Sequence, residues 1–192
     1  MADVGPRIAP LDRADWDETL SRLIGGAPGG ADEPMHIFTT LAHQPDLFRR
    51  WLGFGGALLA GRLPGRLREL VILRTAYRFD GRYEWAHHID LGAAQGITPA
   101  ETAALGGDLG AIAWEPFEAA ALAAVDETAT EGAVTDATWS VLAARLNEGE
   151  LVELLMLMAH YMMLSTVLRS LRVPLEPSAL TLAEGVPGGP SA

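Results

Sequence analysis

The sequence predicts an all-α protein. Alanine and leucine dominate it, β-branched residues are sparse, and no stretch shows the alternation of apolar and polar residues that is typical of a β-strand. The chain has 192 residues, of which 49% are hydrophobic, so it is long enough to bury a sizeable core and is not disordered by composition. We therefore expect one main helical domain.

The first helices are bounded by glycine and proline. A helix over 13–24 is expected to end at the glycine-rich run 25–30, and a short helix over 34–42 to end before Pro45. Pro45 can occupy the first turn of the next helix, 45–60. Three glycines inside that helix indicate either a closely packed neighbour or a break, because each costs about 1 kcal/mol relative to alanine.

The next two helices form a hairpin. One runs from Pro64 to about residue 78, residues 79–82 turn the chain, and the second runs over 82–95 with Gly96 at its end. Thr98 and Glu101 form a capping box that begins a short helix. The later helices are expected at 116–130, 135–146 and 149–164, the last continuing with a bend to Arg172.

These elements suggest three parts. Residues 1–30 would be an N-terminal helical arm with its linker, 31–175 the helical domain, and 176–192 a flexible C-terminal tail whose last ten residues are disordered. The longest apolar stretch, Leu151–Leu164, is too short to span a bilayer, so a buried core helix is expected there. No signal peptide is expected in the first fifteen residues.

Charge and cysteine content exclude several functions. The formal net charge of −11 repels phosphate backbones, so no nucleic-acid partner is expected, and no membrane partner is expected either. The chain has no cysteine, which excludes disulfides, thiolate zinc sites and thiol redox chemistry. The absence of cysteine fits a cytoplasmic protein.

Three ionisable side chains on the hairpin form the candidate catalytic site. Glu84 and His88 are four residues apart and share one helix face, and Glu69 lies on the preceding helix. The helix face around Glu69 is apolar, which disfavours its charged form and predicts a raised pKa. Two carboxyl groups and an imidazole that converge in an apolar hairpin are suited to proton transfer.

Structural roles for the same residues remain open. Glu84 and His88 can be an ordinary helix pair worth a few tenths of a kcal/mol. Glu69 can pair with one of three neighbouring arginines, Arg66, Arg68 or Arg74.

Four further residues are candidates for substrate binding. Arg74 follows Glu69 in an apolar segment and can hold a substrate carboxylate, or else form a salt bridge. Tyr77 and Tyr83 flank the turn and can orient a substrate. His87 faces about 100° away from His88 and is otherwise a surface or subunit-contact residue.

Metal binding is the less favoured interpretation. Glu84 and His87 have the Glu-x-x-His spacing of di-iron proteins, but the sequence contains no second copy of that motif. No metal ligand and no cofactor are therefore expected. His160, in the last apolar helix, is expected to be a hydrogen-bonded core histidine, with a pocket-lining role as the alternative.

The hairpin resembles a known family. Arg-Glu-Leu at 68–70 in an apolar helix, a glycine turn and Tyr-Glu-Trp-x-x-His at 83–88 are similar to the carboxymuconolactone decarboxylase family, which shares its fold with the AhpD alkylhydroperoxidases. The resemblance covers roughly residues 34–105. It implies an AhpD-like helical bundle and a homo-oligomer, as a homodimer, homotrimer or homohexamer.

The resemblance also implies a function. The peroxidase branch carries two cysteines where this chain has Gly81 and Glu84, so thiol peroxidase chemistry is excluded here. The decarboxylase branch carries acid–base residues that correspond to Glu69, Glu84 and His88. We therefore expect a cofactor-independent lyase or isomerase acting on a small enolisable carboxylic acid or lactone. The alternative is a non-catalytic, oligomeric ligand-binding relative.

Overall fold

The computed structural model describes residues 5–30, 32–179 and 189–190. Within these residues the all-α prediction is confirmed, because they contain helices and no β-strand. The prediction of a disordered C-terminus falls almost entirely outside the described residues. The elements in chain order are η1 (Arg13–Asp15), α1 (Glu18–Gly25), α2 (His36–Leu41), α3 (Pro45–Leu59), α4 (Gly65–Arg78), α5 (Arg82–Ala94), α6 (Pro99–Leu105), η2 (Leu109–Ala111), α7 (Pro116–Glu131), α8 (Asp136–Ala143) and α9 (Glu148–Leu171).

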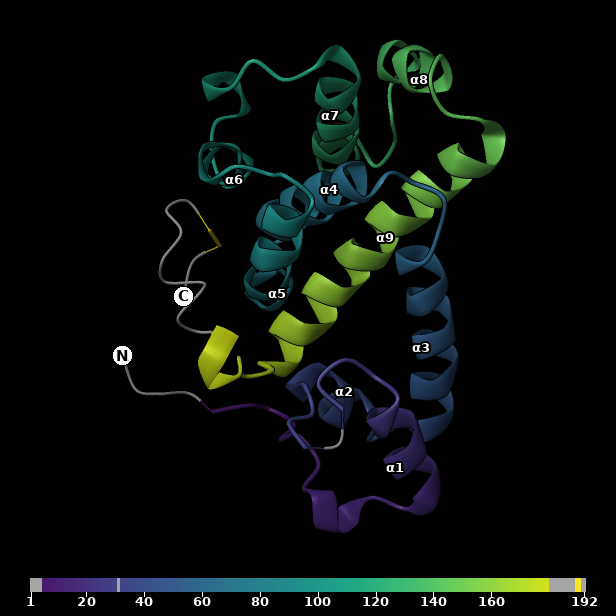
Figure 1. The fold of residues 1–192 in the computed structure, drawn as a ribbon, viewed down its shortest axis with the longest axis vertical. Coiled ribbons are helices and arrows are strands. Elements are labelled where there is room, and N and C mark those ends of the chain that lie inside the picture. Colours follow the sequence, from purple (N-terminus) through teal and green to yellow (C-terminus); the bar gives the residue numbers. More distant parts are fainter. Residues whose placement is uncertain (1–4, 31, 180–188, 191–192) are drawn as a thin grey trace.

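Helix α4 is the centre of the fold. It packs against α5, α7 and α9, so it is covered on several sides, and the four consecutive residues 70–73 have no exposed surface. Figure 1 shows α4 behind the diagonal α9, with α7 and α8 at one end of the molecule and α1 and α2 at the other. Four consecutive apolar residues face all sides of a helix, so this stretch is stable only where neighbouring elements surround it.

Helix α9 runs diagonally along the molecule, and its length agrees with the predicted continuation to Arg172. It has 24 residues, begins with a capping box of Asn147 and Glu150, and ends before Arg172, which has a left-handed backbone conformation. By length and composition alone α9 is able to cross a membrane, as buried core helices often are. Half of its most apolar window is buried among the described residues, which agrees with the predicted core helix.

The N-terminal segment is interrupted where one helix was expected. The side chain of Asp17 accepts a hydrogen bond from the backbone N–H of Leu20 at 2.7 Å and so begins α1 anew after η1. Leu20 and Ile24 are buried in the same core cluster as α4 and α9. The segment expected to be an arm therefore contributes side chains to the main core.

Helix α3 is continuous despite its glycines. A Cβ atom added at Gly55 would lie 3.4 Å from Nε2 of His160, whereas Gly53 and Gly56 face open space. Of the two explanations that the sequence offered, a close neighbour is correct at Gly55, and the neighbour is the His160 ring of α9.

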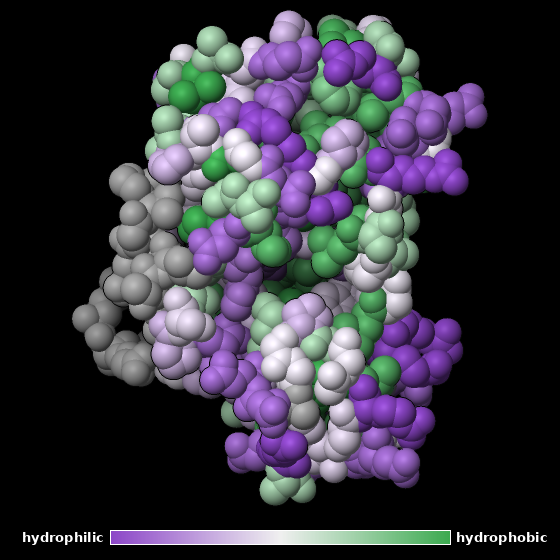
Figure 2. Space-filling model, in the orientation of Figure 1, coloured by the Kyte–Doolittle hydropathy of each residue, from purple (hydrophilic) through white to green (hydrophobic). Residues whose placement is uncertain are grey.

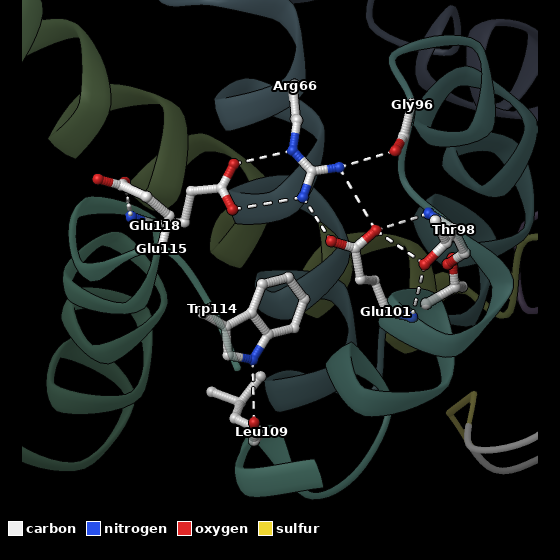
Figure 3. Close-up of polar contacts among 9 residues, drawn as sticks. Arg66, Gly96, Thr98, Glu101, Leu109, Trp114, Glu115 and Glu118 are labelled. Carbon is white, nitrogen blue, oxygen red and sulfur yellow. Dashed lines mark hydrogen bonds and ion pairs between the residues drawn. The ribbon is translucent and has the colours of Figure 1, made fainter. Parts of the chain in front are cut away.

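An arginine network holds the start of α4 to two other helices (Figure 3). Arg66 binds Glu101 of α6 at 2.5 Å and Glu118 of α7 at 2.8 Å, and its guanidinium also donates to the carbonyl of Gly96. The hydrogen bond from Arg66 lowers the pKa of Glu101 to about 2. Arg66 is therefore committed to this network and does not pair with Glu69.

Candidate active site

A buried hydrogen bond joins the two helices of the hairpin. Nδ1 of His88, on α5, lies 2.7 Å from Oε2 of Glu69, on α4, and both residues are buried. The other carboxylate oxygen of Glu69 accepts a hydrogen bond from Nε of Arg68 at 3.2 Å. Glu69 and His88 thus meet as the sequence predicted, and the expected pairing of Glu69 with one of the three arginines involves Arg68.

The protonation of Glu69 differs from the prediction. Burial alone raises its pKa, but the hydrogen bonds and charges of His88 and Arg68 outweigh burial and lower it below the ordinary value. The prediction of a raised pKa was wrong because these two partners belong to the tertiary structure. An ionised carboxylate only accepts hydrogen bonds, so Nδ1 of His88 donates to it, and in neutral His88 the lone pair lies on Nε2.

Tyr161 of α9 extends this pair into a line of three side chains. Its hydroxyl group lies 3.1 Å from Nε2 of His88, and the two rings meet edge to face with centroids 5.1 Å apart. Burial raises the pKa of Tyr161 far above its usual value, so the hydroxyl keeps its proton and can donate it to Nε2. Tyr161 was not a predicted site residue, since it lies 73 positions from His88 in sequence.

Glu84 has a different environment from Glu69. It is 3% exposed, and neither of its carboxylate oxygens has a hydrogen-bond partner among the described residues. Burial raises the pKa of Glu84 to about 7. Glu84 makes no hydrogen bond to His88, so Glu69 is the carboxylate that orients the His88 ring. The buried carboxyl group that titrates near neutrality is Glu84.

Gly81 makes room for the Glu84 carboxyl group. A Cβ atom at this position would lie 2.8 Å from Oε2 of Glu84 and would overlap the Ser165 side chain of α9. A larger residue would therefore push Glu84 and Ser165 away from the turn. The glycine that replaces a cysteine of the peroxidase pattern is thus required by packing.

A cavity of about 600 Å³ lies beside these groups. It is bounded by residues from α1, α2, α3, α5 and α9, and its walls are mostly apolar. Figure 2 shows hydrophobic side chains in a hollow near the middle of one face of the molecule. The polar or ionisable side chains that line the cavity are those of Tyr83, Glu84, His87, His88, Asp90, His160, Tyr161 and Ser178, together with the indole of Trp51.

A second carboxylate, Glu176, orders one edge of the cavity. Its Oε1 accepts from the hydroxyl of Tyr83 at 2.6 Å and from the backbone N–H of His36 at 2.5 Å, and its Oε2 lies 2.7 Å from Nε2 of His87. The sequence placed Glu176 at the start of a flexible tail, whereas the structure holds it against α2 and α5. Tyr83 and His87 line the cavity as predicted candidates, with their polar atoms bonded to Glu176.

Arg74 and Tyr77 lie outside the cavity lining. The guanidinium of Arg74 binds both carboxylate oxygens of Asp126 at 2.8 and 2.7 Å and donates to the carbonyls of Leu105 and Gly107. It also stacks over the ring of Tyr77, 5.2 Å from its centroid. The prediction that Arg74 holds a substrate carboxylate is corrected, because these contacts occupy it as a structural clamp between α4 and α7.

His160 is buried and also lines the cavity. Its ring stacks on Trp51 with centroids 6.0 Å apart and meets Tyr161 edge to face. Burial lowers the pKa of His160 to about 4, so the ring is neutral at pH 7. Its Nδ1 has no hydrogen-bond partner among the described residues, so the predicted hydrogen-bonded core histidine is replaced by the pocket-lining alternative.

The histidines of α5 serve different carboxylates. His87 binds Glu176 and His88 binds Glu69, in agreement with their predicted separation around the helix. Across the described residues, no three histidine or acidic side chains are grouped as metal ligands.

The central helices match a known protein family. Residues 45–127, which include the hairpin motifs, match the model of the carboxymuconolactone decarboxylase family, in agreement with the resemblance seen in the sequence. No curated protein matches the chain.

Solved structures show the fold of the whole chain. An AhpD-core, peroxidase-related protein from Ralstonia eutropha JMP134 has a TM-score of 0.79 at 16% identity, covering 93% of this chain and 96% of its own. The debrominase Bmp8, as a variant in complex with 2,3,4-tribromopyrrole, has a TM-score of 0.76 at 17% identity, covering 95% and 98%. A peroxidase-related protein from Silicibacter sp. TM1040 has a TM-score of 0.75 at 11% identity, covering 89% and 93%. At these identities the likeness shows the fold alone, and the predicted AhpD-like bundle is confirmed.

Proposed function

We propose, on the premise that residues 45–127 form a domain of the carboxymuconolactone decarboxylase family, that this protein is a cofactor-independent acid–base enzyme. Its substrate is a small enolisable carboxylic acid or lactone, which it decarboxylates or isomerises. The observation that carries the proposal is the hydrogen-bonded line of Glu69, His88 and Tyr161 at the wall of a cavity of about 600 Å³.

The three residues have distinct roles in proton transfer. Nε2 of His88 takes a proton from the carbon next to the substrate carbonyl, and the electrons of that C–H bond move to form an enolate. The hydroxyl of Tyr161, which donates to Nε2 in the free site, gives up that hydrogen bond when Nε2 takes the substrate proton and donates to the enolate oxygen instead. Ionised Glu69 stabilises the imidazolium that results, and His88 then returns the proton to carbon.

Glu84 supplies a second proton-transfer group. Its carboxyl group titrates near neutral pH, which is the range in which a general acid or base is most effective. Glu84 lines the cavity, and its buried oxygens have no hydrogen-bond partner among the described residues, so they are available to a substrate.

The alternative function is ligand binding without catalysis. The hydrogen bond from Arg68 to Glu69 favours it, because a carboxylate held by an arginine also serves a structural pair. The cavity beside His88 is common to both functions, so measurement of proton exchange separates them. Homo-oligomer formation and a cytoplasmic location remain part of the proposal.

The experiment is hydrogen–deuterium exchange at carbon, followed by proton NMR with a panel of small enolisable acids and lactones in D₂O. The wild-type protein should accelerate exchange for at least one compound, and His88→Gln should abolish the acceleration while keeping helical content. His43→Gln, which changes an exposed histidine outside the cavity, is the matched control. Full exchange activity in His88→Gln would exclude the proposed role of His88.

A further inference from the structure

The cavity has an apolar wall formed by helices of the N-terminal half. Met35 and Phe38 lie on or beside α2, and Trp51, Leu52 and Leu59 lie on α3. His88 of α5 and Tyr161 of α9 also line the cavity. A ligand that fills this space therefore buries most of its surface against carbon atoms and meets a small number of polar groups.

No arginine or lysine lines the cavity in the described part of the chain. All 14 basic residues of the sequence are arginines, and each of them lies within the described residues. None belongs to the cavity lining. The arginines of α4 nearest to the hairpin are paired with Glu69, Glu101, Glu118 and Asp126.

The histidines of the cavity do not replace the missing cation. His88 is bonded to Glu69, and His87 is bonded to Glu176. His160 is neutral at pH 7, because burial lowers its pKa. If His87 or His88 takes up a proton, the positive charge of its ring is balanced by the carboxylate to which it is hydrogen-bonded.

Carboxylates lie behind the lining histidines instead, since Glu69 pairs with His88 and Glu176 pairs with His87. Glu69 and Glu176 both have lowered pKa values, since hydrogen bonds outweigh the effect of burial, so both are ionised at pH 7. Asp90 lies on the lining as well. A ligand carboxylate would lose its hydration, gain no arginine partner and face like charges, all of which disfavour binding.

We infer that this site takes a neutral, largely apolar ring compound with a carbonyl group, such as a lactone, an ester or a ketone, and rejects carboxylates. The inference rests on the proposed function for the chemistry that follows binding. It removes decarboxylation from the two reactions proposed above, because a decarboxylase must bind a carboxylate. Proton transfer within a neutral carbonyl compound, an isomerisation, is then the reaction that the cavity admits.

Binding of a matched pair of probes tests the inference without activity. Methyl 2-naphthoate and 2-naphthoate differ in charge and share the ring, and their dissociation constants are measured by isothermal titration calorimetry at pH 7.5. We expect the ester to bind at least about tenfold more tightly than the acid. Equal or tighter binding of 2-naphthoate by the wild-type protein would overturn the inference.

A charge added to the cavity tests where the probes bind. Leu59 lines the cavity and is 42% exposed, so Leu59→Arg brings a cation to the lining without burying it. It should tighten 2-naphthoate binding about three- to tenfold and leave ester binding within about threefold. Leu47→Arg, on the same helix at an exposed position outside the lining, should change neither. Equal effects of the two variants would show that the probes bind elsewhere, and would overturn the inference.

The two proposals fail in different ways. If the wild-type protein prefers the ester but exchanges no carbon-bound proton of any neutral compound, the acid–base function fails and the ligand class stands. If the protein exchanges protons of a carboxylate and binds 2-naphthoate more tightly than the ester, the ligand class fails and the function stands.

Discussion

Nδ1 of His88 donates a hydrogen bond of 2.7 Å to Oε2 of Glu69, although the two residues are 19 positions apart in the sequence. The contact fixes the orientation of the imidazole and leaves Nε2 towards Tyr161, 3.1 Å away. A histidine held in this way is positioned both to take a proton and to be stabilised when it has done so.

Removing the charge of Glu69 should impair proton transfer while keeping the fold. Glu69→Gln retains the size of the side chain but cannot stabilise an imidazolium, so we expect turnover to fall about 100-fold or more. The measurement is the rate of proton exchange for the compound that the wild-type protein accelerates. Glu131→Gln, an exposed change at the end of α7, is the control, and equal rates in the two variants would contradict the role of Glu69.

Tyr161→Phe should separate catalysis from stability. The variant loses one hydrogen bond to His88, which costs about 1 kcal/mol of unfolding free energy. Loss of the donor to the enolate should lower kcat about tenfold or more, with a smaller change in KM. Chemical denaturation and steady-state kinetics measure the two effects, and an unchanged kcat would show that Tyr161 only packs against the histidine.

Glu84 should make the protein less stable as the pH rises. Its pKa is about 7 in the folded chain and 4.5 in the unfolded chain, so below pH 4.5 both states carry the proton. Between pH 4.5 and 7 the unfolded chain releases this proton while the folded chain keeps it. The free energy of unfolding therefore falls by up to roughly 3 kcal/mol across this range. The difference in unfolding free energy between Glu84→Gln and the wild-type protein should therefore shift in favour of the variant as the pH rises from 5 to 8. Urea denaturation at both pH values measures the gain, and a constant difference would contradict the raised pKa.

Arg74 should prove structural. Replacing it by methionine leaves Asp126 and two carbonyls without their partner, so we expect a loss of about 3 kcal/mol of unfolding free energy. Arg74→Lys should recover little of this loss, because an ammonium group cannot bind both carboxylate oxygens in the plane of a guanidinium. Thermal denaturation measures both changes, and wild-type stability in Arg74→Met would exclude the clamp.

Glu176 should anchor the segment that follows α9. Its pKa lies near 2: burial raises it, but hydrogen bonds from His87, Tyr83 and the His36 backbone outweigh burial. The anchoring is thus complete above pH 4.5 and is lost as the pH falls towards 2. Glu176→Gln should increase amide hydrogen exchange over residues 173–179 at pH 7, and exchange at the wild-type rate would contradict the anchoring.

Helix positions followed well from the sequence because their signals are local. The capping box of Thr98 and Glu101 and the proline at the start of α3 are formed as predicted. Periodicity could not show that Asp17 would end one helix and begin another, since the competing conformation depends on a single side-chain hydrogen bond.

The candidate site also combines features that follow from local sequence with features that depend on tertiary contacts. That Glu69, Glu84 and His88 lie on facing helices of a hairpin follows from spacing, and Glu69 and His88 do meet. Tyr161 and Glu176 come from the end of the chain, and no spacing rule connects them to α5. Arg74 was assigned to the substrate because its partner Asp126 lies 52 residues away.

The sequence by itself determined the all-α class, the hairpin, the family resemblance of its central helices and the absence of cysteine, because composition, helical period and residue identity are properties of the chain. Only the tertiary structure decided which carboxyl group is ionised. Burial acts on both Glu69 and Glu84, but His88 and Arg68 reach only Glu69, and so the two glutamates of one hairpin hold their protons differently.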